Sequence, residues 1–85
     1  MANVEIYTTP ICGYCMRAKT LLKRKNIAFT EIDLFKEPKR REEMMNRSGG
    51  RYTVPQIFIN GESIGGSDEL HALDRNKQLD AKLGK

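Results

Sequence analysis

The chain has 85 residues, of which 39% are hydrophobic and 31% charged, and its formal net charge at pH 7 is +4. This length predicts one small domain, residues 1–85, rather than several. No apolar stretch approaches the ~18 residues that a membrane-spanning helix needs, so we expect no membrane partner. Because the first residues lack the charged and then apolar pattern of a signal peptide, we also expect a cytoplasmic location.

The first part of the chain alternates between strand and helix patterns. Val4–Thr8 is rich in β-branched and aromatic residues and predicts a strand. From Cys12 the apolar spacing becomes helical, which places Cys12 at the helix tip and Cys15 on the buried face. A second strand is expected over Ala28–Phe35, where apolar and polar residues alternate.

The middle of the chain predicts a second helix and a central strand. Pro38 suits the first turn of a helix, and Met44 and Met45 are expected on its inner side. The helix should end at Gly49-Gly50, because glycine favours the conformation that terminates a helix. Ile57–Ile59 is apolar on both faces, so we expect a strand in the interior of a sheet.

The last part of the chain predicts a hairpin and a final helix. Asn60-Gly61 is a strong signal for a tight hairpin turn, after which a fourth strand pairs back. Ser67 is expected to cap the last helix, and Leu79 and Leu83 would fold the tail back as a further turn or two. The order β-α-β-α-β-β-α predicts an α/β fold with a mixed four-stranded sheet and helices on both faces, in which a right-handed crossover joins the first two strands.

The cysteine pair, Cys12 and Cys15, leaves three interpretations open: a zinc site, a structural disulfide or a redox centre. Structural zinc needs four Cys or His ligands, and the sequence offers only one histidine, His71, which we expect at the surface of a helix. A disulfide that closes so small a loop adds little stability. A C-x-x-C pair that follows a strand and opens a helix is instead typical of a thioredoxin-like dithiol.

The position of the pair predicts a role for each sulfur. Amide N–H groups at a helix N-terminus lack intrahelical partners and, with the helix dipole, stabilise a thiolate. Ionising a thiol of pKa ~8.5 at neutral pH requires about 2 kcal/mol, the upper limit of the dipole effect, so we expect the amides of Tyr14 and Cys15 to contribute. Cys12 should therefore attack a disulfide as a thiolate, and Cys15 should resolve the mixed disulfide.

Three motifs stand in order along the chain: Cys12-Gly13-Tyr14-Cys15, Thr53-Val54-Pro55 and Gly65-Gly66-Ser67-Asp68. With these motifs the whole chain resembles a glutaredoxin, in particular the small bacterial glutaredoxin 3 type. The resemblance implies a thioredoxin-like fold and an enzyme that reduces protein disulfides and glutathione mixed disulfides, with glutathione as its co-substrate. It also implies disulfide-containing or glutathionylated proteins as partners, and we expect a monomer.

The resemblance further implies which residues bind glutathione. Pro55 would follow a cis peptide bond, and the backbone of Val54 would pair with the cysteinyl part of glutathione like a short added strand. The amides of Ser67 and Asp68 would bind the γ-glutamyl carboxylate at a helix N-terminus, and Asp68 would hold the ammonium group. The full set implied is Tyr14, Thr53, Val54, Pro55, Gly66, Ser67 and Asp68.

Two residues depart from the pattern of many relatives. Thr9 stands where many carry lysine, which removes a charge expected beside the thiolate and beside glutathione. Gly13 stands where many carry proline, and some members with a small residue there hold a [2Fe–2S] cluster between two protomers with glutathione as a further ligand. A cluster-binding dimer that uses Cys12 is therefore an alternative function. Arg40, Arg41 or a nearby lysine would meet the glycine carboxylate of glutathione, and spacing does not choose among them.

Basic residues gather in two runs, Lys23–Lys25 and Lys36–Arg41. They predict solvated helix surfaces or a mild attraction to anionic ligands, and a basic interaction module that uses the second run is a third candidate function. Nucleic acid is not an expected partner, because no aromatic residue is interleaved with these runs as base stacking would require.

Overall fold

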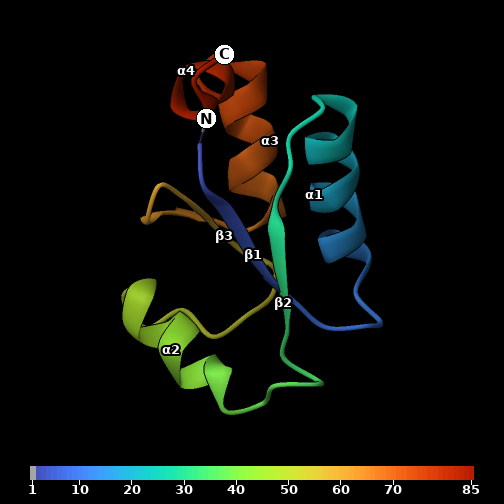
Figure 1. The fold of residues 1–85 in the computed structure, drawn as a ribbon, viewed down its shortest axis with the longest axis vertical. Coiled ribbons are helices and arrows are strands. Elements are labelled where there is room, and N and C mark those ends of the chain that lie inside the picture. The colour runs from blue at the N-terminus through green and yellow to red at the C-terminus, as the bar shows by residue number, and fades with distance from the viewer. Residues whose placement is uncertain (1) are drawn as a thin grey trace.

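The computed structural model describes residues 2–85 (Figure 1). The elements follow one another in the order β1, α1, β2, α2, β3, β4, α3 and α4. The strands are β1 Val4–Thr8, β2 Thr30–Asp33, β3 Gln56–Ile59 and β4 Glu62–Gly65. The helices are α1 Gly13–Arg24, α2 Arg40–Arg47, α3 Ser67–Arg75 and α4 Leu79–Leu83.

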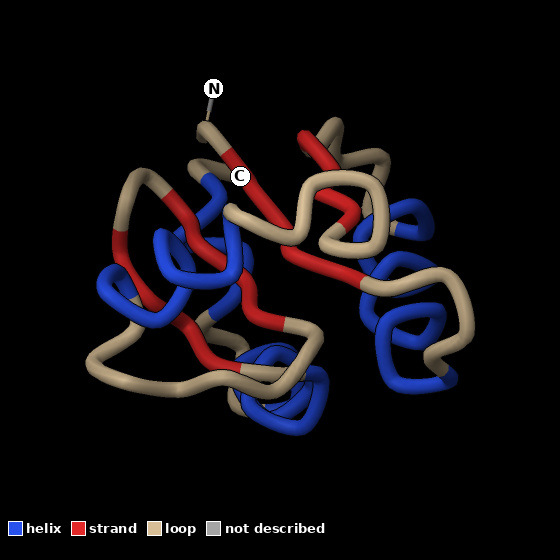
Figure 2. Tube along the Cα trace, turned by 90° about the horizontal axis from the view of Figure 1, so that it is seen from below, coloured by secondary structure: helices blue, strands red, loops and turns tan. Residues whose placement is uncertain are grey.

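The strands form one mixed sheet in the order β2-β1-β3-β4. Strand β1 is parallel to β2 and antiparallel to β3, and β3 and β4 form an antiparallel hairpin. All four side chains of β3 are buried, as expected for an interior strand with both faces covered. The predicted α/β fold with a mixed four-stranded sheet is confirmed, and Figure 2 shows the helices packed around the strands in a view from below.

An apolar cluster fills each face of the sheet. The larger cluster, on what we call the α1/α3 face, contains Val4, Ile6, Ala18, Leu21, Leu22, Ile57, Ile59, Leu70, Leu79 and Leu83. The smaller cluster, on the α2 face, contains Tyr7, Ile32, Leu34, Met44 and Phe58. Neighbouring residues of β1 and β3 fall into different clusters because successive side chains of a strand point to opposite faces.

The predicted hairpin turn is confirmed at Asn60 and Gly61. Both residues have positive φ angles, 52° and 82°, as this kind of tight turn requires. The side chain of Asn60 accepts a hydrogen bond from the amide of Asn3 at 2.9 Å, and the Asn60 amide donates to the Asn3 carbonyl at 2.8 Å. These two bonds fix the turn against the start of β1.

Two elements are shorter than the sequence predicts. Strand β2 covers only the middle of Ala28–Phe35, and α2 begins at Arg40, two residues after Pro38, which lies in the preceding turn. Within residues 2–85, no helix has the length and apolar character needed to cross a membrane.

Two details of the helices differ from the prediction. Met44 is fully buried, but Met45 is 36% exposed, because consecutive residues of a helix point about 100° apart and a short helix cannot bury both. Ser67 is the first residue of α3, and Gly66 takes the cap position. The carboxylate of Glu69 accepts a hydrogen bond from the Gly66 amide at 2.6 Å, at the end where we expected the Ser67 side chain to act.

Candidate functional site

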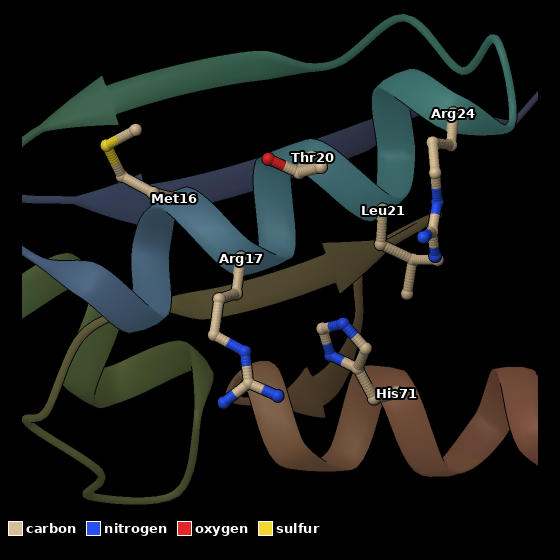
Figure 3. A pocket seen from close by; sticks show the side chains of 6 residues that line it. All are labelled: Met16, Arg17, Thr20, Leu21, Arg24 and His71. Carbon is tan, nitrogen blue, oxygen red and sulfur yellow. The ribbon is translucent and has the colours of Figure 1, made fainter.

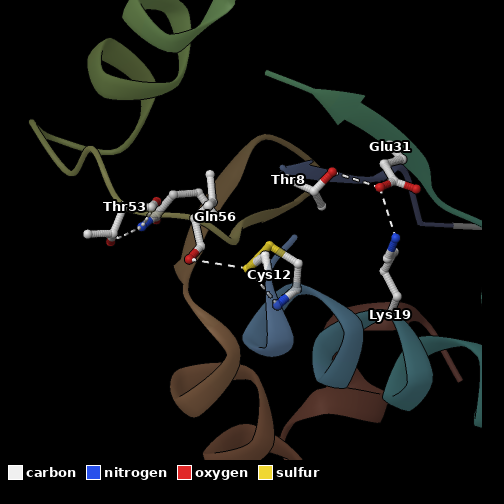
Figure 4. Close-up of a disulfide and its surroundings, with 8 residues drawn as sticks. Thr8, Cys12, Lys19, Glu31, Thr53 and Gln56 are labelled. Atoms are coloured by element: carbon white, nitrogen blue, oxygen red, sulfur yellow. Dashed lines mark hydrogen bonds and ion pairs between the residues drawn. A yellow bond between two sulfur atoms is a disulfide. The ribbon is translucent and has the colours of Figure 1, made fainter. Parts of the chain in front are cut away.

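Cys12 and Cys15 form a disulfide at the N-terminal end of α1, with their Cα atoms 5.2 Å apart (Figure 4). Cys12 is the N-cap residue of the helix, with an extended backbone (φ −151°, ψ 104°), and its Sγ accepts a hydrogen bond from the Cys15 amide at 3.1 Å. Cys12 is partly exposed, whereas Cys15 is 1% exposed. The helical spacing predicted this placement of one sulfur at the tip and one inside.

This geometry favours negative charge on the Cys12 sulfur once the disulfide is reduced. The Cys15 amide already donates to that sulfur, and the first turn of α1 contains no acidic side chain that would oppose the charge. The helix dipole adds ~0.3–1 kcal/mol in the same direction. The arrangement can therefore present a nucleophilic thiolate at the surface with a second thiol one turn behind it.

The loop that precedes β3 lies beside the disulfide. The Val54-Pro55 peptide bond is cis, as predicted, and the Val54 carbonyl oxygen lies 4.0 Å from Cys12 Sγ. The side-chain amide of Gln56 donates to the carbonyl oxygen of Thr53 at 3.0 Å and to its hydroxyl at 3.4 Å. The fully buried Gln56 thereby holds the loop against the sheet, a role that the sequence analysis missed.

A groove of about 380 Å³ brings the predicted glutathione-binding residues together. Three segments that are far apart in the sequence line it: the start of α1, the cis-proline loop and the start of α3. The lining residues are Tyr14, Arg51, Thr53, Val54, Pro55, Gly66, Ser67, Asp68 and Glu69. All seven residues of the predicted site are among them. The volume of the groove fits a small peptide-like ligand.

Arg51 and Glu69, which the sequence analysis did not single out, connect two walls of the groove. Arg51 Nη2 donates to Glu69 Oε1 at 3.0 Å, and the Gly66 amide donates to the same oxygen. The Gly66 amide and then Arg51 hold the pKa of Glu69 below its ordinary value. Gly65 leaves room for the pair: its φ is +110°, and a Cβ there would lie 2.5 Å from Glu69 Oε1 and 2.7 Å from Arg51 Nη1.

The two arginines considered for the glycine carboxylate of glutathione do not line this groove. Arg40 pairs with Glu43 at 2.9 Å, and Arg41 donates to the carbonyl oxygen of Tyr52. Arg51 is the arginine that lines the groove, and a basic residue two positions before the Thr-Val-Pro motif was the sequence signal for it.

Lys19 of α1 does not replace the positive charge of the lysine that many relatives carry in place of Thr9. Lys19 Nζ donates to the carboxylate of Glu31 at 2.9 Å, and the Thr8 hydroxyl donates to the same oxygen at 2.7 Å (Figure 4). The Thr8 hydroxyl, followed by Lys19, lowers the pKa of Glu31 below its ordinary value. The positive charge of Lys19 is therefore paired with a carboxylate.

His71 lies on α3 and is half-buried, so part of its side chain is at the surface as predicted. Its Nδ1 lies 2.7 Å from the carbonyl oxygen of Ser67 and 3.3 Å from the Ser67 hydroxyl. Because a carbonyl oxygen only accepts, Nδ1 carries a hydrogen and donates it. Across the described part of the chain, no group of three or more His, Cys, Asp or Glu side chains is arranged to hold a metal ion.

Sequence comparisons identify proteins similar to this chain. The sequence model of the glutaredoxin family matches residues 4–64. The chain is 54% identical over 83 residues to Glutaredoxin 3 of Escherichia coli K12, an alignment that covers 98% of this chain and 99% of that protein.

Solved structures are similar to this chain as well. The solution structure of glutaredoxin from Brucella melitensis has a TM-score of 0.82 and 52% identity, and the match covers 100% of this chain and 94% of that one. The crystal structure of a buckwheat glutaredoxin–glutathione complex has a TM-score of 0.89 and 28% identity, with 98% of this chain and 77% of that chain covered.

Proposed function

The chain belongs to the glutaredoxin family and has its thioredoxin-like fold, and from this premise we propose how its residues divide the reaction. The protein is a glutathione-dependent thiol–disulfide oxidoreductase with a cysteine pair at its active site. In our assignment, Cys12 is the nucleophile and Cys15 is the resolving thiol. The exposed N-cap position of Cys12 and the burial of Cys15 support this division.

In the route for glutathione mixed disulfides, only Cys12 reacts. Its thiolate attacks the glutathione sulfur, a Cys12–glutathione disulfide forms, and the substrate leaves as a thiolate that takes up a proton. A second glutathione thiolate then attacks the glutathione sulfur of that disulfide. This step releases oxidised glutathione and restores the Cys12 thiolate.

In the route for protein disulfides, both cysteines react. Cys12 attacks one sulfur of the substrate disulfide and forms a mixed disulfide, and the Cys15 thiolate then attacks Cys12 Sγ and releases the reduced substrate. The product is the Cys12–Cys15 disulfide that the structure contains. Two glutathione molecules reduce it again and leave as oxidised glutathione.

We assign glutathione to the groove beside Cys12, and one observation carries this assignment: seven residues expected from the family motifs line a single groove. The Val54 backbone would pair with the cysteinyl part of glutathione, and the amides of Ser67 and Asp68 would bind the γ-glutamyl carboxylate. The Asp68 carboxylate would bind the ammonium group. Tyr14, which is 57% exposed, would flank the sulfur.

We further propose that residues 1–85 act as one domain, as a monomer, and in the cytoplasm. Disulfide-containing and glutathionylated proteins would be its protein substrates. The glutaredoxin relatives do not favour the alternative of a cluster-binding dimer, because they point to a thiol–disulfide oxidoreductase with a reactive cysteine pair.

The assignment is tested by glutathione-dependent turnover of a small glutathione mixed disulfide. Cys12→Ser should abolish turnover, because no nucleophile remains, whereas Cys15→Ser should retain it and lose only the reduction of protein disulfides. Asp68→Asn, a change confined to the groove, should raise the KM for glutathione about tenfold with kcat nearly unchanged. Turnover by the Cys12→Ser variant would contradict the assignment of the nucleophile, and an unchanged KM in Asp68→Asn would contradict that of the groove.

A further inference from the structure

A second hollow lies between α1 and α3, next to the dithiol but outside the glutathione groove. Its volume is about 230 Å³. We call it the basic cup, and it is lined by Met16, Arg17, Thr20, Leu21, Arg24 and His71 (Figure 3). Arg17 and Arg24 extend from α1 towards α3, and His71 rises from α3 between them (Figure 3).

The arginines of the basic cup differ from two lysines on the same helix. Lys19 pairs with Glu31 at 2.9 Å, and the C-cap residue Lys25 pairs with Asp74 at 2.8 Å. Neither Arg17 nor Arg24 forms an ion pair with any residue in the range 2–85, and no carboxylate lines the cup. The fold therefore neutralises the two lysines and leaves two guanidinium groups open to an anion.

The remaining lining gives the cup a fixed wall and an apolar floor. The bond from Nδ1 of His71 to the Ser67 carbonyl holds the imidazole ring and leaves Nε2 as its free nitrogen. Leu21, which is fully buried, supplies apolar surface between the two arginines and His71 (Figure 3). A carboxylate on a short aliphatic stem, as in glutamate or aspartate, matches a cationic rim over such a floor.

We propose that the basic cup binds an acidic side chain of the protein substrate while the substrate's cysteine reacts at Cys12. The inference rests on the proposed function, since it names the substrates that the dithiol would select. From Cys12 to Thr20, in the middle of the cup, the helix rises about 12 Å. An extended peptide covers this distance in about four residues, so preferred substrates should carry Glu or Asp roughly three to five residues from the reactive cysteine.

The test uses three glutathionylated peptides that differ only in the residue four positions from the cysteine, which is Glu, Gln or Lys. At low salt the wild-type protein should turn over the Glu peptide with a kcat/KM about three- to fivefold above that of the Gln peptide. The advantage should shrink in high salt because ions screen exposed charges. Two series of these peptides should be compared, one with the variable residue before the cysteine and one with it after. The preference for Glu over Gln should appear in at least one of the two series.

Variants of Arg24, two turns beyond the dithiol, separate the cup from net charge. Arg24→Gln should lower kcat/KM for the Glu peptide about threefold, and Arg24→Glu should make the Lys peptide the better substrate. Lys39→Gln, a matched loss of one positive charge on the opposite side of the sheet, should leave the order of the peptides unchanged. All of these variants should turn over a small glutathione mixed disulfide at the wild-type rate.

Each outcome decides one question. If the wild-type protein fails on the small mixed disulfide, the proposed function is wrong. If it reduces that substrate but shows no preference among the peptides in low salt, the basic cup is not a docking site and the proposed function stands. If Arg24→Gln and Lys39→Gln lower kcat/KM for the Glu peptide equally, the attraction comes from net charge, and the basic cup is not a docking site. Binding of an oligonucleotide that Arg24→Gln weakens, without any peptide preference, would assign the arginines to nucleic acid instead.

Discussion

The α1/α3 face of the sheet is filled by the larger apolar cluster, whereas the α2 face combines a smaller cluster with a network of charges. In that network Arg47 donates to the Glu5 carboxylate at 2.7 and 3.1 Å and to the Tyr7 hydroxyl at 2.8 Å. Its guanidinium group also lies 4.2 Å from the centre of the Phe58 ring. The Tyr7 hydroxyl in turn donates to Glu43.

The difference follows from the helices that cover each face. Helix α1 has 12 residues and buries four of them, including Leu21 and Leu22, so apolar packing alone can hold it. Helix α2 has eight residues and buries only Met44, and so short a helix has little stability of its own. We infer that the charge network holds α2 in place. The dithiol and the start of α3 lie on the face with the larger cluster, whereas Val54 of the cis-proline loop packs against the smaller cluster.

The largest expected effect comes from opening the apolar cluster of the α1/α3 face. Leu70 of α3 is completely buried, and Leu70→Ala should lower the free energy of unfolding by about 2–5 kcal/mol through lost transfer energy and a residual cavity. Urea denaturation at pH 7 measures this loss, with the exposed Ala81→Gly at α4 as a milder control. A loss below about 1 kcal/mol would mean that this face is not the main source of stability.

A smaller loss is expected when the charge network of the α2 face is broken. Arg47→Met keeps an apolar stem over Phe58 but removes the donor to Glu5 and to the Tyr7 hydroxyl, which should cost about 1–3 kcal/mol. Turnover of a small glutathione mixed disulfide should stay within twofold of the wild type, because none of these groups lines the groove. A large loss of kcat in a variant that remains folded would show that the α2 face also shapes the site.

A single hydrogen-bonding group tests how the network is connected. Tyr7→Phe removes the hydroxyl that donates to Glu43 and accepts from Arg47, and we expect a loss of about 1 kcal/mol. In a double-mutant cycle with Glu43→Gln, the combined loss should be smaller than the sum of the single losses. Strict additivity would mean that the two residues contribute separately.

The smallest expected effect is a dependence on pH. Arg40 and then the Tyr7 hydroxyl hold the pKa of Glu43 below its ordinary value of 4.5. Near and below that pH, the unfolded chain binds more protons than the folded protein. The stability that ionised Glu43 contributes above pH 4.5 is therefore lost as the pH is lowered. Glu43→Gln should reduce the slope of stability against pH between about 5 and 3. Leu70→Ala should shift the whole curve downward without changing that slope, and a changed slope there would contradict the comparison.

The features that the sequence predicts well depend on neighbouring residues. The Asn60-Gly61 turn, the burial of Cys15 and the interior position of β3 all follow from local spacing and from the conformations that glycine and asparagine tolerate. The cis bond before Pro55 followed from the family resemblance. The fold could be predicted from the sequence because its local signals agree with one another.

The features that the sequence analysis missed are pairings between distant segments. Arg51 meets Glu69 across 18 positions, and Arg47 meets Glu5 across 42. An exposed and a partly buried arginine look alike in a sequence, because only the folded chain decides which carboxylate or aromatic ring lies within reach. The same reason explains why Arg40 and Arg41 were considered for a contact with glutathione.

The two ends of the described chain have a practical consequence. Ala2 and Lys85 border the same small cavity, and Figure 1 places both termini at the top of the molecule, away from the loop into Cys12 in its lower half. A fluorescent reporter fused through either end would therefore leave the dithiol and its groove unobstructed. A short linker could also join the ends, which makes a circularly permuted redox probe, opened at the exposed Asn60-Gly61 turn, a realistic design.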